Sequence, residues 1–356
     1  MKKALIAMSG GVDSSVAACL VKQEGFDCVG MMMKLYGNDD VGVENTKTCC
    51  SLEDVADARG VAHKLAMPFY VADFTTDFKT EVMDRFISGY QKGETPNPCI
   101  DCNRYMKFEK LYARAKQLGF DYVVTGHYAS IKFDEERGRY LLKKSVDEDK
   151  DQSYVLYSMT QEQLAHTLFP LGGLQKSNVR EIAETQGFIN ANKRDSQDIC
   201  FVPDGDYAKF IEEYGKQTYK PGNFIDKQGN VLGLHKGVIR YTIGQRKGLG
   251  LAFAQPMYVC EKNAVENTVT LCEDKELFVK SLYATDFNWI ACEKPSAPLR
   301  IKAKIRYKHI EQWAMAEVVA DDLVHIEFDE PQRAIASGQA VVLYNGDIVV
   351  GGGRIK

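Results

Sequence analysis

The stretch ALIAMSGGVDSS, residues 4–15, joins a short apolar run to two glycines and then to a polar helix start. The apolar residues 4–8 predict a buried strand, and the residues from about 14 to 25 have a helical pattern. Two glycines let the backbone approach a ligand closely, and the N–H groups at a helix start suit a phosphate group. We therefore expect a phosphate-binding loop at residues 9–15.

The polar side chains of this loop also fit a phosphate-binding function. The hydroxyls of Ser9, Ser14 and Ser15 add donors, and Asp13 suits a Mg²⁺ contact because that ion prefers carboxylates together with phosphate oxygens. The plain structural alternative is a Gly-Gly turn with a serine helix cap, but the complete strand–loop–helix order favours phosphate binding. The loop matches neither the GxxxxGK[ST] pattern nor the dinucleotide GxGxxG pattern.

Strand and helix patterns alternate through the rest of the first half. We expect further strands at 28–33, 69–72 and 122–125, separated by helices at 51–65, 77–91 and 105–118. Short apolar runs between helices are typical of a parallel sheet covered on both faces. The first half therefore predicts an α/β domain.

The second half has a different pattern. After a helix near 207–214, glycine and proline become frequent, and short alternating strands continue to the end of the chain. Such a pattern indicates one or two all-β regions. We expect three domains, at 1–205, 206–280 and 281–356.

The bulk composition is that of an ordinary globular protein. The chain has 356 residues, 45% hydrophobic and 26% charged, a length that suits two or three domains. The net charge of -4 neither demands nor excludes a nucleic-acid partner. The first apolar run is shorter than the roughly 7–15 residues of a signal core, and no run approaches the roughly 20 residues of a membrane helix. We expect a cytoplasmic protein without a membrane partner.

The loop and several other segments resemble a known family. SGGVDSS alone is similar to the PP-loop of ATP pyrophosphatases, which include GMP, argininosuccinate and NAD synthetases. Together with the other segments, the chain resembles the bacterial tRNA-specific 2-thiouridylase family over essentially its whole length. These segments are ALIAMSGGVDSS (4–15), CCSLEDVADAR (49–59), TPNPCIDCNRYMKF (95–108), TGHYA (125–129), KDQSYVLY (150–157), RDSQDICF (194–201), YTIGQRKGLG (241–250) and YNGDIVVGGG (344–353).

This resemblance implies a fold and a reaction. The fold is a parallel-sheet PP-loop α/β domain (adenine nucleotide hydrolase-like), a small central domain that contacts tRNA, and a C-terminal β-barrel. The reaction is ATP-dependent 2-thiolation of the wobble uridine, position 34, in the tRNA anticodon loop. It passes through an adenylylated uridine and releases AMP and pyrophosphate. The implied partners are tRNA and a sulfur-donor protein, such as a cysteine desulfurase or a sulfur relay protein.

The resemblance also implies site residues, carried over position by position. Cys102 corresponds to the nucleophile and Cys200 to the persulfide-bearing cysteine, while the remaining positions fall into three groups. The ATP-binding positions, with Mg²⁺ at Asp13, are Ala7, Met8, Ser9, Gly10, Gly11, Val12, Asp13, Ser14, Met33 and Gly126. The positions that meet the target base are Asn97, Pro98 and Cys99, and those that contact tRNA are Lys150, Asp151, Gln152, Arg306 and Tyr307.

Cys99 departs from the familiar pattern of this family, which has aspartate at that position. Cys99, Cys102 and Cys200 make three thiolates, which can hold an iron–sulfur cluster with one open iron site. A structural zinc needs a fourth ligand, for which Cys49 and Cys50 are candidates. Cys99 also fits a plain replacement of a base-contacting side chain, or a redox pair with Cys102. The sequence leaves these alternatives open.

A basic segment near the C-terminus predicts a contact with RNA. Residues 300–308, RIKAKIRYK, alternate basic with mostly apolar side chains, so a strand here would direct five positive charges to one face. A solvated face over a barrel core is the common alternative, but a phosphate backbone would relieve the repulsion among these charges. Lys236, Arg240, Arg246 and Lys247 extend this basic surface if they lie nearby.

Two other classes of protein remain to be separated from an RNA-modifying sulfurtransferase. A PP-loop ligase that acts on a small molecule would leave the three cysteines and the basic segment unexplained. A tRNA-binding protein with a relic loop conflicts with the intact SGGVDSS and with both matching cysteines.

Overall fold

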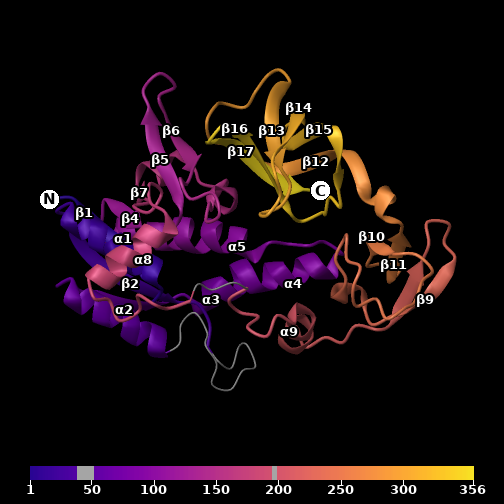
Figure 1. Cartoon of the computed structure of the whole chain (residues 1–356), viewed down its shortest axis with the longest axis horizontal. Helices are drawn as coiled ribbons and strands as arrows, with labels where there is room; N and C mark the ends of the chain where they lie inside the picture. Colours follow the sequence, from indigo (N-terminus) through magenta and orange to yellow (C-terminus); the bar gives the residue numbers. More distant parts are fainter. Residues whose placement is uncertain (38–51, 195–198) are drawn as a thin grey trace.

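A computed structural model describes residues 1–37, 52–194 and 199–356 of the chain. Figure 1 shows three lobes: an N-terminal α/β domain, a β-barrel that ends at the C-terminus, and a smaller central domain beside them. The predicted α/β, central and barrel architecture is confirmed. Cys49 and Cys50 lie outside the described residues.

The N-terminal domain is built on a five-stranded sheet in which every neighbouring pair is parallel. Its core strand carries Ala4, Leu5 and Ile6, which are fully buried, so helices cover the sheet rather than solvent. The strands, in spatial order, are β3 (Phe69–Asp73), β2 (Asp27–Lys34), β1 (Lys3–Ala7), β4 (Tyr122–Val124) and β7 (Thr167–Leu168).

Helices follow these strands where the sequence predicts them, with additions. The predicted strands and helices of the first half are confirmed with small shifts, whereas β7, α8 and the hairpin of β5 and β6 were not predicted. The helical elements are α1 (Val12–Gln23), α2 (Leu52–Lys64), α3 (Thr75–Phe78), η2 (Lys79–Met83), α4 (Asp84–Gln91), α5 (Pro98–Asp101), η3 (Cys102–Leu111), α6 (Tyr112–Gln117), η4 (Ser153–Leu156), α7 (Gln161–Ala165), α8 (Lys176–Thr185) and α9 (Tyr207–Tyr214).

The helix that carries the C-x-x-C begins earlier than predicted. We expected it at 105–118, but α5, η3 and α6 run on without a break from Pro98 to Gln117. Proline is well tolerated at the first helical position, and the Asn97 side chain caps the helix by accepting from the Cys99 amide at 3.1 Å. Its middle part, η3, is π-helical, a form that is frequent at functional sites.

A closed six-stranded barrel forms the C-terminal domain. The order is β12 (Phe278–Trp289), β15 (Leu323–Arg333), β14 (Gln312–Ala320), β13 (Leu299–Lys304), β16 (Ala340–Asn345) and β17 (Ile348–Ile355), and pairing between β12 and β17 closes it. The hairpin of β5 (Ala129–Asp134) and β6 (Arg139–Lys144) belongs to the first half of the chain, yet β6 pairs with β17. The first and last domains therefore share one hydrogen-bonded sheet.

The central domain is a small sheet of four strands. They are β10 (Tyr258–Asn263), β11 (Thr268–Cys272), β8 (Gly222–Ile225) and β9 (Val231–His235), with the short helices η5 (Val238–Arg240) and η6 (Asp274–Leu277). Phe224, Val259, Val269 and Leu271 are buried in the same hydrophobic cluster as α4 and α9. The central domain thus packs on the helices that follow β3.

The basic segment near residue 300 is only partly a strand. Ile301, Ala303 and Ile305 are buried in the barrel core, which confirms the alternation, but β13 ends at Lys304. The expected strand through residue 308 is therefore wrong, and the last two basic residues lie on a turn. The five basic charges therefore do not share one strand face, because only Arg300, Lys302 and Lys304 lie within β13.

One half-buried lysine links the central domain to the first. Lys262 of β10 donates from Nζ to the Glu94 carbonyl oxygen at 3.1 Å and lies 5.5 Å from the centre of the Tyr90 ring. Burial lowers its pKa from 10.5 to about 8, against the opposing effect of Glu94. Folding therefore penalises the charged ammonium.

We predict a pH-dependent stability effect of Lys262→Met. Between about pH 8 and pH 10.5 the unfolded chain holds a proton on this lysine that the folded chain lacks, so stability from this group rises with pH. Between pH 7.5 and pH 10, the difference in free energy of unfolding, wild type minus variant, should rise by on the order of 2 kcal/mol. Urea unfolding at both pH values measures this. The exposed Lys92→Met is the control, and an equal response of both variants contradicts the prediction.

Candidate functional site

The phosphate loop lies between β1 and α1, at the carboxyl edge of the sheet. Gly10 has φ +76°, and a Cβ there would lie 2.5 Å from the Asp54 carbonyl oxygen, so only glycine fits. The Ser14 hydroxyl donates to the Gly11 carbonyl at 3.0 Å and accepts from the Ser9 amide at 3.2 Å. Gly11 is the N-cap of α1, and no side chain caps this helix start in the described structure. The helix amides are therefore oriented as a phosphate site requires.

Asp13 is held by two partners at the start of α1. Lys176 Nζ contacts both carboxylate oxygens, at 2.7 and 2.8 Å, and the Tyr128 hydroxyl donates to Oδ1 at 2.8 Å. Lys176 is the first residue of α8 and its side chain is only 12% exposed. The sequence analysis missed this lysine. Lys176 stands at a helix start after a parallel strand, a position at the same sheet edge as the loop. This position is the feature that could have indicated it.

The other predicted nucleotide positions meet at this edge. Gly126 follows β4, and a Cβ there would lie 2.7 Å from the Asp13 carbonyl carbon and 2.8 Å from the Ser14 nitrogen. Met33 is half-buried near the carboxyl end of β2, Ala7 ends β1, and the Met8 amide donates to the Met31 carbonyl at 2.9 Å. The structure therefore brings together the nucleotide positions that the resemblance implied.

Two residues behind the loop were not predicted. The Asn190 side-chain amide donates to the Gly10 carbonyl and to the Ser15 hydroxyl, each at 2.9 Å. Lys193 Nζ binds Asp54 at 2.7 Å and Asp57 at 2.6 Å, and these contacts tie α2 to the segment that leads toward Cys200. Both residues act on backbone and carboxylate partners that are far away in sequence, so no local pattern marked them.

His127 follows Gly126 and is buried beside it. Its Nδ1 lies 2.6 Å from the Thr125 hydroxyl and its Nε2 lies 3.1 Å from Lys107 Nζ. Burial, with Lys107 as a second cause, holds the pKa of His127 well below its ordinary value. The imidazole is therefore neutral near pH 7, which leaves one ring nitrogen as an acceptor for the lysine.

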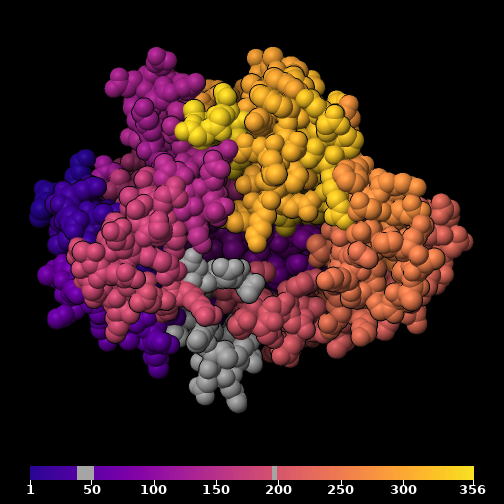
Figure 2. Space-filling model, viewed as in Figure 1, coloured from indigo at the N-terminus to yellow at the C-terminus, as the bar shows by residue number. Residues whose placement is uncertain are grey.

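Cys99 and Cys102 lie on one face of the helix that begins at Pro98. Residues three apart are neighbours on a helix surface, so both thiols point to the same side. Cys99 is exposed, Cys102 is half-buried, and Pro98 is buried behind them. In Figure 2 the dark purple part of the chain, which includes α4 and the segment toward α5, shows at the bottom of a hollow between the barrel and the central domain.

Cys200 approaches the same region from another part of the chain. Its carbonyl oxygen accepts a hydrogen bond from the Tyr36 hydroxyl at 2.5 Å, and Tyr36 follows β2. Cys102 and Cys200 both pack against one aromatic cluster that contains Phe78, Phe86 and Phe201. The fold therefore brings two cysteines that are 98 residues apart to one hydrophobic cluster.

The parts of the chain that the structure describes show no cluster of metal-binding side chains. Among residues 1–37, 52–194 and 199–356, no group of three or more His, Cys, Asp or Glu side chains is placed to hold a metal ion.

The predicted tRNA positions divide into internal and accessible ones. Asp151 is buried and accepts from the Ser153 hydroxyl at 2.8 Å, while Gln152 Oε1 accepts from the Tyr128 amide at 3.0 Å. Lys150 is half-buried. Arg306 donates to the carbonyl oxygens of Arg333 and Ala334. Asp151 and Gln152 therefore make hydrogen bonds inside the first domain, and Arg306 makes them inside the barrel domain.

Tyr307 connects these positions to the target-base stretch. Its ring lies 6.1 Å from that of Tyr154, centre to centre. Burial raises the pKa of Tyr307, and the nearby Asp151 and Cys99 raise it further. Tyr307 also packs against the hydrophobic cluster that contains Ile100, the residue after Cys99.

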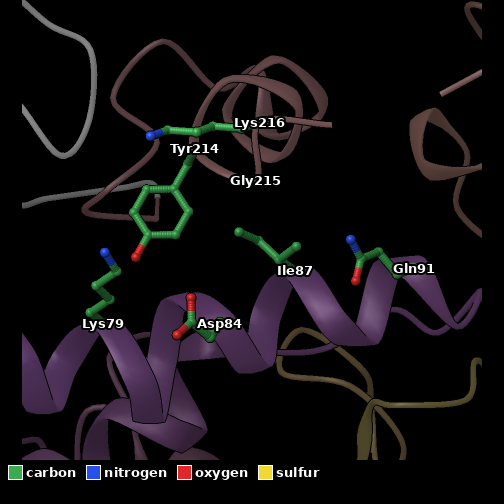
Figure 3. A pocket seen from close by; sticks show the side chains of 7 residues that line it. All are labelled: Lys79, Asp84, Ile87, Gln91, Tyr214, Gly215 and Lys216. Carbon is green, nitrogen blue, oxygen red and sulfur yellow. The ribbon is translucent and has the colours of Figure 1, made fainter. Parts of the chain in front are cut away.

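An open groove lies apart from this site. Figure 3 shows it between the helix of η2 and α4 and the end of α9, with Lys79 Nζ 5.3 Å from the centre of the Tyr214 ring. It is lined by Lys79, Asp84, Ile87, Gln91, Tyr214, Gly215 and Lys216. None of the predicted site residues lines this groove.

Comparison with known proteins identifies the family. Residues 2–204 match the family described as tRNA methyl transferase HUP domain, residues 208–273 the tRNA methyl transferase PRC-barrel domain, and residues 279–355 the aminomethyltransferase beta-barrel domain. Among similar proteins is a tRNA-specific 2-thiouridylase MnmA of Clostridioides difficile, 54% identical, covering 100% of this chain and 98% of that protein.

Two further relatives have the same name and comparable coverage. The MnmA 1 protein of Thermoanaerobacter pseudethanolicus is 52% identical, covering 99% of this chain and 98% of that protein. The MnmA protein of Acetivibrio thermocellus is 50% identical, covering 100% and 99%. With identities this high over full length, and all three domains matched, the chain belongs to the tRNA-specific 2-thiouridylase family.

Proposed function

We propose that this protein is a tRNA-uridine 2-sulfurtransferase that uses ATP to replace the C2 oxygen of the wobble uridine, position 34, by sulfur. One observation carries the proposal: the helix that carries Cys102 meets the nucleotide edge through Lys107 and His127, and Cys200 packs on the same hydrophobic cluster as Cys102. Family membership supplies the substrate class, because the full-length relatives are tRNA-specific 2-thiouridylases.

The chemistry follows from the weakness of uridine C2 as an electrophile. Its oxygen attacks the α-phosphorus of ATP, pyrophosphate leaves, and the adenylylated oxygen becomes a good leaving group. The terminal sulfur of a Cys200 persulfide then attacks C2, and the C–O bond breaks to release AMP. Cys102 attacks the inner sulfur of Cys200, which releases the thiolated base and forms a disulfide that an external thiol reduces.

The nucleotide end of the site has the charges that this reaction needs. The helix-start amides at Gly11 to Asp13 would bind phosphate oxygens, and Lys176 adds a cation next to them. Mg²⁺ accompanying ATP would supply further charge neutralisation, and Asp13 with the loop hydroxyls would hold it. Asp13 would then exchange part of its contact with Lys176 for the metal ion.

The RNA end of the site is the region around Cys99 and Tyr307. We propose that Asn97, Pro98 and Cys99 meet the splayed-out base, while Lys150 to Gln152 and Arg306–Tyr307 contact the anticodon loop. A wobble base lies in a single-stranded loop, so it can leave its stack at low cost. The packing of Tyr307 against the cluster that contains Ile100 supports this assignment, because Ile100 directly follows Cys99 in the chain.

Three accompanying proposals concern the setting of the enzyme. A cysteine desulfurase or sulfur relay protein would load Cys200 with sulfur, and the cytoplasm, where tRNA is modified, is the proposed location. No helix in the described parts of the chain is long and apolar enough to cross a membrane. We also propose domain boundaries near residues 205 and 280.

The first test is the reaction itself, with Asp13→Ala as the matched variant. Purified wild type with tRNA, ATP, Mg²⁺ and a sulfide source should yield 2-thiouridine in digested tRNA, measured by mass spectrometry. Asp13→Ala should lose at least 100-fold in rate because the loop loses its metal contact and the Lys176 counterion.

Asp27→Ala, at the opposite end of the same sheet, should keep the wild-type rate. A folded Asp13→Ala protein with wild-type activity contradicts the assignment of the loop. Formation of a small-molecule product without 2-thiouridine would instead indicate a ligase, and tRNA binding without any product would indicate a binding protein.

The two cysteines should act as one unit. Cys102→Ser and Cys200→Ser should each lower the thiolation rate at least 1,000-fold. The rate of the double variant should be little lower than that of either single variant. The half-buried Cys292→Ser of the barrel is the control and should retain activity. If the losses multiply across the pair, the two thiols act in independent steps and the proposed disulfide step is wrong.

For Cys99 we propose a role in contacting the base, with sulfur carried as a persulfide rather than on a cluster. This choice rests on the described residues, among which no group of three or more His, Cys, Asp or Glu side chains is placed to hold a metal ion. Protein purified and reconstituted anaerobically should contain no stoichiometric iron or sulfide, and Cys99→Asp should thiolate tRNA within about threefold of the wild type. Stoichiometric iron with visible absorption that Cys99→Asp abolishes would overturn this proposal in favour of the cluster.

A further inference from the structure

The segment that carries the reactive cysteine is fastened to the barrel at both of its ends. We call residues 94–104 the cysteine segment, because they contain the base-contacting stretch 97–99 and the nucleophile Cys102. Figure 1 shows α5 between the N-terminal sheet and the barrel, with β12 and β17 on the barrel side. The segment makes one contact with the barrel at each end, and we call these two contacts the fastenings. The charged barrel residue in each fastening belongs to one of these two strands.

The first fastening lies just before the base-contacting stretch. The Arg354 guanidinium of β17 pairs with the Glu94 carboxylate. The Thr95 amide donates to the Ser337 carbonyl at 2.8 Å, and a Cβ on Gly338 would lie 3.1 Å from that amide nitrogen. The backbone of the barrel therefore approaches the cysteine segment more closely than side chains would allow.

The second fastening lies two residues after Cys102. The Arg104 guanidinium makes two hydrogen bonds to the Asp286 carboxylate, one of them at 3.0 Å. Asp286 has φ +51°, a left-handed conformation that costs free energy in any residue except glycine. Such a residue persists only where its surroundings require that conformation.

The two fastenings are coupled through the seam that closes the barrel. Thr285 of β12 pairs with Arg354 of β17, and the register between these strands shifts between Thr285 and Asn288. The shift is a bulge that contains Asp286, and bulges are common where a sheet redirects a side chain next to an active site. The closing seam therefore directs one acidic and one basic side chain at the two ends of the cysteine segment.

Asp101 lies between Cys99 and Cys102 in the chain, within the segment that the two fastenings hold. Burial raises the pKa of its carboxyl group to about 6, and the positive charges of Arg354, Arg85 and Arg104 oppose this effect. Because one fastening precedes Cys102 and the other follows it, rotation or sliding of the helix would disturb both at once.

We propose that Asp286 and Arg354 are positioning residues, which set the place of Cys102 relative to the target base by fixing the cysteine segment against the barrel seam. This rests on the proposed function for its substrate. Partly exposed ion pairs contribute little to stability, whereas misplacement of reacting groups by about 1 Å costs on the order of 100-fold in rate. Loss of either pair should therefore lower the rate far more than the stability.

The decisive variant is Asp286→Asn. Asparagine tolerates the left-handed conformation and is close in size, so the change removes the charge pair without new strain. The exposed Asp321, which pairs with Lys294 elsewhere on the barrel, is the control as Asp321→Asn. Arg354→Met tests the other fastening.

We expect Asp286→Asn and Arg354→Met to lower the single-turnover thiolation rate of persulfide-loaded enzyme about 10- to 100-fold at saturating ATP and tRNA. KM for tRNA should stay within about twofold and the thermal midpoint close to that of the wild type. The rate of Cys102 alkylation by iodoacetamide, followed by mass spectrometry, should change at least threefold in each variant. Asp321→Asn should match the wild type in every measurement.

Other outcomes overturn the proposal. A thiolation rate within twofold of the wild type would show that the fastenings do not position Cys102. A raised KM with an unchanged rate would make the seam a tRNA-binding surface, and a rate loss matched by loss of folded protein would make it a structural contact only. Because alkylation of Cys102 needs no tRNA, it tests positioning even if the wild type formed no 2-thiouridine, which would be a failure of the proposed function alone.

Discussion

The contact between Gly10 and the backbone of Asp54 is the constraint on which the nucleotide site depends. No side chain fits at Gly10, so the loop passes directly over the start of α2, and α1 begins with its amides turned to the sheet edge. The same closeness at Gly126 brings the strand end of β4 against Asp13. The two glycines thus allow close backbone contact of the loop with α2 and of the end of β4 with α1, and Lys176 and Lys193 bind carboxylates beside these contacts.

Local periodicity was sufficient to predict the parallel sheet. The apolar pattern of a buried strand or an amphipathic helix lies within a few consecutive residues, so it can be recognised without a distant partner. It was insufficient where the partner decides the structure. The hairpin of β5 and β6 pairs with β17, some 200 residues later, and the basic segment leaves its strand at Lys304, where its pairing with β16 ends. Helix α5 was missed because its start depends on one cap, Asn97, and on one proline.

The same distinction applies to the site. The glycines and cysteines were predictable because their chemistry is marked in short motifs, and the resemblance supplied their roles. Lys176, Asn190 and Lys193 were not, because each binds a backbone or carboxylate group more than 130 residues away. Conversely, Asp151 and Gln152 were expected to contact RNA and also serve as internal hydrogen-bond acceptors. Residue type alone does not separate these two uses, since a carboxylate or amide oxygen accepts from either partner.

A single helix lies next to both parts of the proposed site. It follows the Asn97 cap of the proposed base-contacting stretch and runs from Pro98 to Gln117, carrying Cys102 and then Lys107, whose Nζ lies 3.1 Å from His127 Nε2 next to the proposed nucleotide position Gly126. A helix transmits a displacement of one end to the other because its own hydrogen bonds resist bending. In the proposed reaction ATP activates the C2 oxygen of the uridine and sulfur is delivered to the C2 carbon bonded to it. A shared rigid element would therefore keep the nucleotide and the reactive cysteine in register.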